Sequence, residues 1–152
     1  MVKSIDIFFK IVYNINVNKK IIKDEYNSFK DVQYAGKTLE ERRELDAFFT
    51  PPDITIKMIE GFESIKDKTI LDPTCGTGNL LAACVIAGAN PEMVYGNEFD
   101  SSFVKLCQER LGKLGVPSYH IHQGDALKKE CLDINNFKPG WKYREIKRIE
   151  LW

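Results

Sequence analysis

The residues best suited to binding or catalysis lie in the segment Asp72-Pro73-Thr74-Cys75-Gly76-Thr77-Gly78-Asn79-Leu80. The short apolar run 69–71 predicts a strand that ends at Asp72, and a helix is expected to begin at Asn79. Two glycines between a strand and a helix let the backbone turn closely around a ligand at the end of the strand. The pattern therefore predicts a small-molecule site at this turn.

The same turn argues against a ligand that carries phosphate. Leu81 stands where the third glycine of a dinucleotide fingerprint would fall, so a pyrophosphate over the helix start is disfavoured. The carboxylate of Asp72 would also be desolvated beside the phosphate, and two like charges oppose each other. A carboxylate suits an ammonium or sulfonium group instead. S-adenosyl-L-methionine carries both groups and no phosphate.

Strands and helices are expected to alternate after residue 68. The predicted strands are 69–71, 93–95 and 119–122, and the predicted helices are 79–87, stopped by Gly88, and 101–114. Such alternation indicates βαβ units with a parallel sheet, and hence the α/β class. Glu98 then follows the second strand and Asp125 the third. Because parallel strands end at one edge of a sheet, three carboxylates are expected to gather there.

A helical region is expected before the sheet. Thr38 and Glu41 form a capping-box pattern, which predicts a short helix running to about Phe48. Thr50 is expected to cap a second helix with Pro51 at its first position. This second helix is indicated by apolar residues at helical spacing, namely Ile54, Met58 and Phe62.

The run 72–81 resembles the cofactor-binding motif of S-adenosylmethionine-dependent methyltransferases, in the form used by adenine-N6 DNA methyltransferases. The segment 48–52 is similar to the FTP-type motif that these enzymes place before it. The resemblance spans 48–126 and implies a shortened Rossmann-like methyltransferase sheet that binds S-adenosyl-L-methionine and transfers its methyl group. The cofactor-binding residues it implies are Phe49, Thr50, Pro51, Asp72, Pro73, Thr74, Cys75, Gly76, Thr77, Gly78, Asn79, Leu80, Glu98, Phe99, Asp125 and Ala126.

Individual roles follow partly from chemistry and partly from this resemblance. Glu98, twenty residues after Gly78, is placed to accept hydrogen bonds from both ribose hydroxyls. The resemblance implies that Phe99 stacks on the adenine and that Asp125 accepts from the adenine amino group. Structural alternatives stay open: a solvated strand end for Glu98, a core position for Phe99 and a helix N-cap for Asp125.

One expected motif of that family is absent from the sequence. The family orients the acceptor amine with an Asp/Asn/Ser-Pro-Pro-aromatic segment after strand four, but the Pro-Pro pair here, Pro51-Pro52, belongs to the earlier motif. The sequence also runs for 27 residues past Asp125, less than the usual further strands need. We therefore expect a cofactor-binding half with unassigned catalytic residues. The alternative is a catalytically incomplete accessory or regulatory module that binds the same cofactor and acts with a partner.

Composition sets further limits. The formal net charge is zero, which excludes a strongly basic nucleic-acid-binding arm as the main function. The four cysteines form no CxxC pair and are expected to be buried thiols in a reducing cytoplasm. His120 and His122 are expected on one face of a strand without a third ligand, so no metal site is predicted. No apolar run of about 18 residues is present, so no membrane span is expected.

We expect one domain, with an N-terminal segment at 1–36 and the cofactor-binding unit at 37–152. Residues 5–17 fit either an amphipathic helix or a β-branched strand. The basic-aromatic tail around Trp141 and Tyr143 fits packing on the sheet or contact with DNA. In the family strand order 3-2-1, one edge of the first strand needs a cover. Residues 144–152, part of 5–17, a partner chain or a second copy are the candidates.

Overall fold

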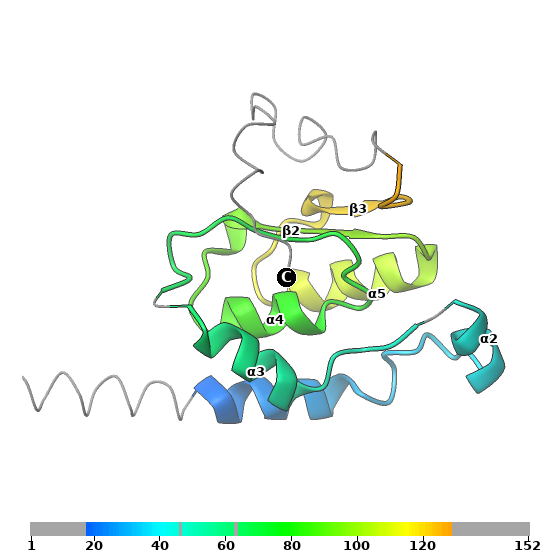
Figure 1. Cartoon of the computed structure of the whole chain (residues 1–152), viewed down its shortest axis with the longest axis horizontal. Coiled ribbons are helices and arrows are strands. Elements are labelled where there is room, and N and C mark those ends of the chain that lie inside the picture. The colour runs from blue at the N-terminus through cyan, green and yellow to red at the C-terminus, as the bar shows by residue number, and fades with distance from the viewer. Residues whose placement is uncertain (1–17, 46, 63, 129–152) are drawn as a thin grey trace, which may run out of the picture.

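The computed structural model of the chain describes residues 18–45, 47–62 and 64–128 (Figure 1). A helical segment at 18–29 comes first and is followed by α2 (Leu39–Glu44) and α3 (Pro52–Glu60). The alternating part then runs through β1 (Ile70–Asp72), α4 (Asn79–Ile86), η1 (Pro91–Met93), β2 (Val94–Glu98), α5 (Ser101–Gly112), η2 (Ser118–His120) and β3 (Ile121–Gln123).

The described strands form one parallel sheet in the order β1-β2-β3. Asp72 pairs with Gly96, and Glu98 pairs with Gln123, so the carboxyl ends of the strands meet at one edge. This confirms the predicted shortened α/β fold with a helical N-terminal part. Among the described residues β1 pairs with β2 alone. Residues 5–17 and 144–152, which were expected to cover its other edge, lie outside the described residues, as does the tail around Trp141.

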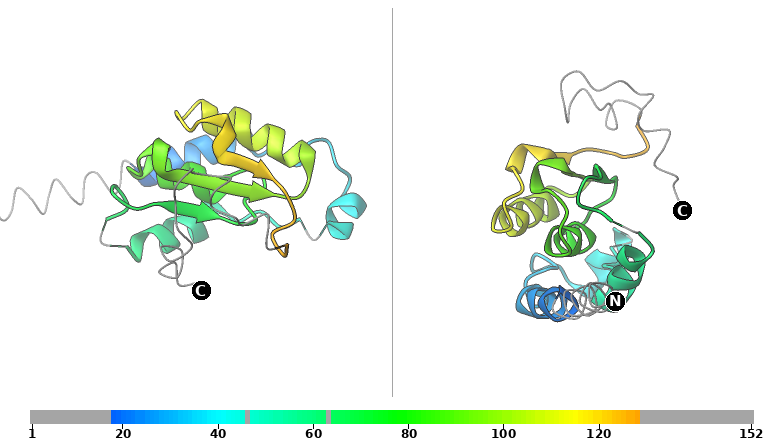
Figure 2. Two further views of the ribbon diagram at one scale, coloured as in Figure 1. Left: turned by 90° about the horizontal axis from the view of Figure 1, so that it is seen from above. Right: turned by 90° about the vertical axis from the view of Figure 1, so that its left-hand side faces the viewer.

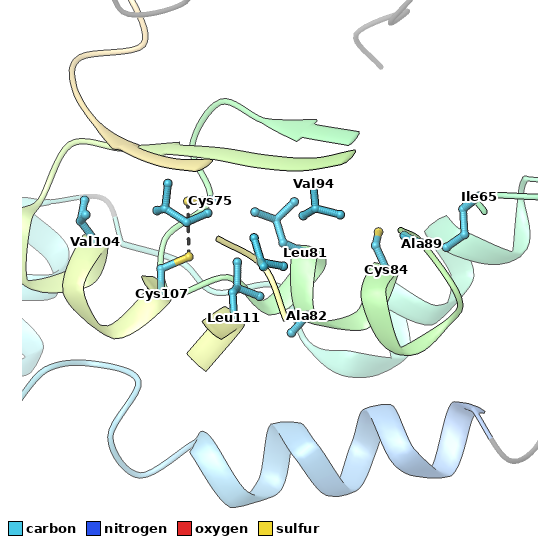
Figure 3. Close-up of a cluster of buried hydrophobic side chains, with 12 residues drawn as sticks. Ile65, Cys75, Leu81, Ala82, Cys84, Ala89, Val94, Val104, Cys107 and Leu111 are labelled. Atoms are coloured by element: carbon cyan, nitrogen blue, oxygen red, sulfur yellow. Dashed lines mark hydrogen bonds between the residues drawn. The ribbon is translucent and has the colours of Figure 1, made fainter. Parts of the chain in front are cut away.

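The helices form two layers on one side of the sheet (Figures 1 and 2). Helices α4 and α5 cover one face, as expected when two right-handed crossovers step in the same direction. The core between them and the sheet includes Leu81, Val94, Cys107 and Leu111, all fully buried (Figure 3). The segment 18–29 and α3 pack beneath α4 through Ile22, Ile56 and Ala83. The N-terminal segment is thus packed against the helical layer.

Several predicted boundaries were wrong. The capping box at Thr38 is present, but α2 ends at Glu44 and does not reach Phe48. Pro51, not Thr50, caps α3, and Pro52 is its first residue. A residue that precedes proline is driven to extended backbone, so Pro51 cannot be helical. Helix α3 buries Thr55 and Ile56. The three apolar residues that indicated the helix, Ile54, Met58 and Phe62, stay about half exposed.

The histidine prediction also needs correction. Because η2 occupies Ser118–His120, β3 begins at Ile121, and His122 alone lies in the strand. The buried His120 places its Nδ1 3.1 Å from the carbonyl oxygen of Val94, and the two rings do not share a strand face. The thiol prediction is confirmed for Cys75, Cys84 and Cys107, which are buried and unpaired by disulfides. Cys131 lies outside the described residues.

Gly96, in the middle of β2, is predicted to resist substitution. A Cβ on Gly96 would lie 2.8 Å from Cys75 Sγ and 2.9 Å from Leu81 Cδ1, so Gly96→Ala should lower the free energy of unfolding by about 1–3 kcal/mol. Gly112→Ala at the end of α5 is the matched control. It meets nothing within 4 Å and should be neutral or stabilising by up to about 1 kcal/mol. Urea denaturation measures both, and equal effects would contradict the close approach.

Candidate functional site

A cavity of about 490 Å³ opens at the carboxyl ends of the three strands. Its wall combines the loop before α3, the glycine turn after β1, the tip of β2 with the start of α5, and the turn after β3. The lining residues are Leu45, Ala47, Phe48, Phe49, Pro73, Thr74, Gly76, Asn97, Glu98, Phe99, Asp100, Phe103, Gly124, Asp125, Ala126 and Leu127. They include the carboxylates of Glu98, Asp100 and Asp125 and, within this described part of the chain, no lysine or arginine. Asp72, which was expected to join Glu98 and Asp125 there, does not line the cavity.

The Glu98 carboxylate holds the glycine turn against β2. Its Oε2 accepts a hydrogen bond of 2.9 Å from the backbone N–H of Gly76, and its Oε1 accepts one of 2.8 Å from Asp100 N–H. Cys75 N–H also donates to Asn97 O at 2.9 Å. Glu98 is therefore built into the site and is not a solvated strand end. Each carboxylate oxygen keeps a second lone pair for a further donor.

Asn97, which is fully buried, ties all three strand tips together. Its Nδ2 donates to Pro73 O at 3.1 Å after β1 and to Gly124 O at 2.9 Å after β3. Its Oδ1 lies 3.1 Å from Nδ1 of His122. This role was not predicted, because no local pattern tells whether an asparagine inside a strand hydrogen-bonds neighbouring strands or faces solvent.

Phe49 packs directly on the turn. A Cβ on Gly76 would lie 2.7 Å from Phe49 Cε1, so the close contact needs glycine, and the positive φ of Gly76 at 54° favours glycine as well. The ring also meets Tyr34 at 4.9 Å and Phe103 at 5.3 Å between centroids. The FTP-like segment and the glycine turn thus form one wall of the cavity.

Phe99 and Asp125 occupy the open side of the site. The Phe99 side chain is 66% exposed, which excludes the core position left open above. Asp125 Oδ1 accepts from Leu127 N–H at 3.0 Å, so the carboxylate caps a short turn and lines the cavity at the same time. Leu127 and Phe48 add apolar surface beside them and are 96% and 84% exposed.

Other predicted site residues lie behind the turn. Cys75, Thr77 and Asn79 are buried, Gly78 packs against Cys107, and Leu80 packs on the core. Cys75 Sγ lies 3.8 Å from Cys107 Sγ (Figure 3), and this contact together with burial raises the pKa of the Cys75 thiol. Burial raises the pKa of Cys84 to about 12. These thiols are neutral and serve packing. Thr50 contributes its carbonyl, which accepts from Asn79 Nδ2 at 3.1 Å, and Pro51 is the N-cap of α3.

The pKa values of Asp72 and Asp100, two acids at or near the cavity, are shifted in opposite directions. Burial raises the pKa of Asp72, against the hydrogen bond from Thr74 N–H, and the Glu98 charge raises it further. Burial would also raise the pKa of Asp100, but hydrogen bonds from Ser102 and Lys37 outweigh it and hold that pKa low. Lys37 Nζ lies 3.2 Å from Asp100 Oδ2. Asp100 is the N-cap of α5, and an aspartate before a helix is a standard local signal that could have predicted this role.

The family of the chain follows from its sequence relatives. Residues 33–138 match the family model described as N-6 DNA Methylase, and this is more than half of the chain. The chain therefore belongs to the N-6 DNA methylase family. It is 30% identical over 101 residues to "Type II methyltransferase M.VspI" of Vibrio sp. (strain 343), covering 62% of this chain and 25% of that protein.

A second relative is "Type II methyltransferase M.CvrRI" of Paramecium bursaria Chlorella virus XZ-6E. The chain is 33% identical to it over 69 residues, covering 45% of this chain and 18% of that protein. The matched part of the chain thus spans a quarter or less of these relatives' own lengths. No solved structure matches the chain.

The described residues hold neither a cluster of metal ligands nor a membrane-spanning helix. No group of three or more His, Cys, Asp or Glu side chains is arranged to hold a metal ion in residues 18–45, 47–62 and 64–128. None of the helices in those ranges has the length and apolar character needed to cross a lipid bilayer.

Asp72 and Asp100 should make the free energy of unfolding depend on pH in opposite ways. Because the pKa of Asp72 is raised in the folded state, its charge lowers stability as pH rises above about 3.8, the unfolded value. Asp72→Asn should therefore gain unfolding free energy over the unaltered chain between about pH 4 and pH 7. The pKa of Asp100 is lowered, so its contribution is present above about 3.8 and disappears as pH falls. Asp100→Asn should lose stability at neutral pH and none in acid.

Urea denaturation across this pH range measures both variants. Asparagine at position 72 keeps an oxygen that can accept from Thr74 N–H, so the comparison isolates the charge. If the stabilities of Asp72→Asn and Asp100→Asn, relative to the unaltered chain, changed with pH in the same direction, the opposite pKa shifts of Asp72 and Asp100 would be contradicted.

Proposed function

We propose that this cavity binds S-adenosyl-L-methionine and that the chain is the cofactor-binding part of a methyltransferase for the N6 amine of adenine in DNA. The observation that supports this most strongly is the lining. Glu98 and Asp125 line the cavity, Asp100 lines it while paired with Lys37, and no basic side chain stands among the lining residues to neutralise a phosphate. Such a wall favours a ligand with cationic ammonium and sulfonium groups.

The residues present fit that cofactor. The volume of about 490 Å³ lies in the range of small-molecule sites. Glu98 has lone pairs for ribose hydroxyls beyond its two backbone bonds, and the exposed ring of Phe99 offers a stacking surface for adenine. Asp125 lies on the same wall as an acceptor for the adenine amine. Phe49 and Thr74 line the cavity beside the glycine turn.

The contribution of this chain to the reaction would be binding and orientation. The bound cofactor supplies a methyl group on a sulfonium, which a nucleophilic amine can accept. The turn at Gly76, held by Glu98, would fix the cofactor so that its methyl group faces one direction, which lowers the entropic part of the barrier. No residue of the chain is assigned a proton-transfer role.

A second candidate is a cofactor-binding module without transfer activity. It is favoured because the Pro51-Pro52 pair opens α3, and the 152 residues hold no Asp/Asn/Ser-Pro-Pro-aromatic segment. Residues that orient the acceptor would then come from a further polypeptide segment or a partner chain, which would also cover the edge of β1 that is unpaired among the described residues. Labelled methyl transfer to DNA separates the two functions. Cofactor binding without transfer assigns the second.

The same proposal includes the cell compartment and the division of the chain. The proposed compartment is the cytoplasm, because the four cysteines form no CxxC pair and suit buried thiols in a reducing environment. Residues 37–152 would form the cofactor-binding unit, supported by the segment 1–36.

Phe99 gives a direct test of cofactor binding. Phe99→Ala should weaken S-adenosylhomocysteine binding by about 1–3 kcal/mol, or about five- to 150-fold, through lost stacking on adenine. Its unfolding temperature should not change, because the ring is 66% exposed. Calorimetric titration measures the affinity. Tyr119→Ala is the matched control, since Tyr119 is 71% exposed and does not line the cavity. If the unaltered chain binds no S-adenosylhomocysteine, the proposed function is wrong.

A further inference from the structure

A buried arginine connects the helical segment 18–29 to the side of the glycine turn that faces away from the cavity. Arg110 lies in α5 and is 4% exposed. Its Nη1 donates to the carbonyl oxygen of Thr77 at 3.2 Å and to Oδ1 of Asn79. Asn79 in turn donates through Nδ2 to Thr50 O. One guanidinium therefore contacts the turn directly and reaches the loop before α3 through a single side chain.

The segment 18–29 fixes the other side of the guanidinium. Nε and Nη2 of Arg110 donate to the two carboxylate oxygens of Glu25 at 2.6 and 2.5 Å. The ring of Phe29 lies 4.4 Å from Cζ of Arg110. The two hydrogen bonds to Glu25 and the stacking on Phe29 need a planar guanidinium with several N–H donors, which lysine cannot provide. Glu25 and Phe29 thus set the orientation in which Arg110 meets the turn.

We propose that Arg110, oriented by Glu25, is a positioning residue of the cofactor site: it holds the turn at Thr77 and the loop at Thr50 in the one relative arrangement that binds the cofactor. This rests on the proposed function. Arg110 does not line the cavity, so it acts through the backbone of the turn and through Asn79. Cofactor affinity would then depend on Glu25, although the segment 18–29 contributes no residue to the cavity lining.

The test compares variants of the full chain by calorimetric titration with S-adenosylhomocysteine, well below each unfolding temperature. Arg110→Lys keeps the charge but loses the fork, and its affinity should fall by about tenfold or more, because small displacements of a binding group are costly. Glu25→Gln should lower affinity in the same direction and serves if Arg110→Lys does not fold. Amide hydrogen exchange at Gly76 and Gly78 should be faster in both variants without ligand.

Two controls separate positioning from stability. Ile22→Ala loosens the packing of the same segment on α3 and α4, and Asp53→Asn breaks the exposed Lys23–Asp53 ion pair between that segment and α3. Both should leave affinity and turn exchange within about twofold of the unaltered chain, which is under 0.5 kcal/mol. If Arg110→Lys binds as tightly as the unaltered chain, or no more weakly than Ile22→Ala, the positioning role is wrong. If the unaltered chain itself does not bind, the proposed function fails and this role fails with it.

Discussion

The site depends on the hydrogen bonds of one buried side-chain amide. Asn97 joins the backbone after β1 and after β3 from its place in β2, with bonds of 3.1 and 2.9 Å. Strands of three residues, such as β1 and β3, have few ladder bonds of their own. Their tips would otherwise be free to separate. Because a buried amide is costly to leave unpaired, the bonds define a single spacing of the tips.

A concentration of acidic groups follows from that spacing. Glu98, Asp100 and Asp125 all line the cavity, while backbone N–H groups of Gly76, Asp100, Ser102 and Leu127 compensate them. Lys37 also pairs with Asp100, so the lining carboxylates without a side-chain cation among the described residues are Glu98 and Asp125. This arrangement supports the proposed cationic ligand over a phosphate.

Close packing beneath the turn adds a second constraint. Gly78 approaches Cys107, and Gly96 approaches Cys75, at distances that leave no room for a Cβ. The thiols are therefore small packing groups that let the turn, β2 and α5 come together (Figure 3). Arg110 adds a further support behind the turn, because it hydrogen-bonds both Glu25 and Thr77, which lie 52 residues apart in the sequence.

The sequence by itself determined the α/β class, the order of the strands and helices after residue 68, and the glycine turn between Asp72 and Asn79. These features depend on local patterns: apolar runs, helix stops and backbone freedom at glycine. It also located Glu98, Phe99 and Asp125 at strand tips, because parallel strands end at one edge. Only the tertiary structure decided the contacts of Asn97 and Arg110 and the exposed place of Phe99. Those features depend on how distant segments meet, and no local pattern in one sequence encodes which buried polar groups will meet.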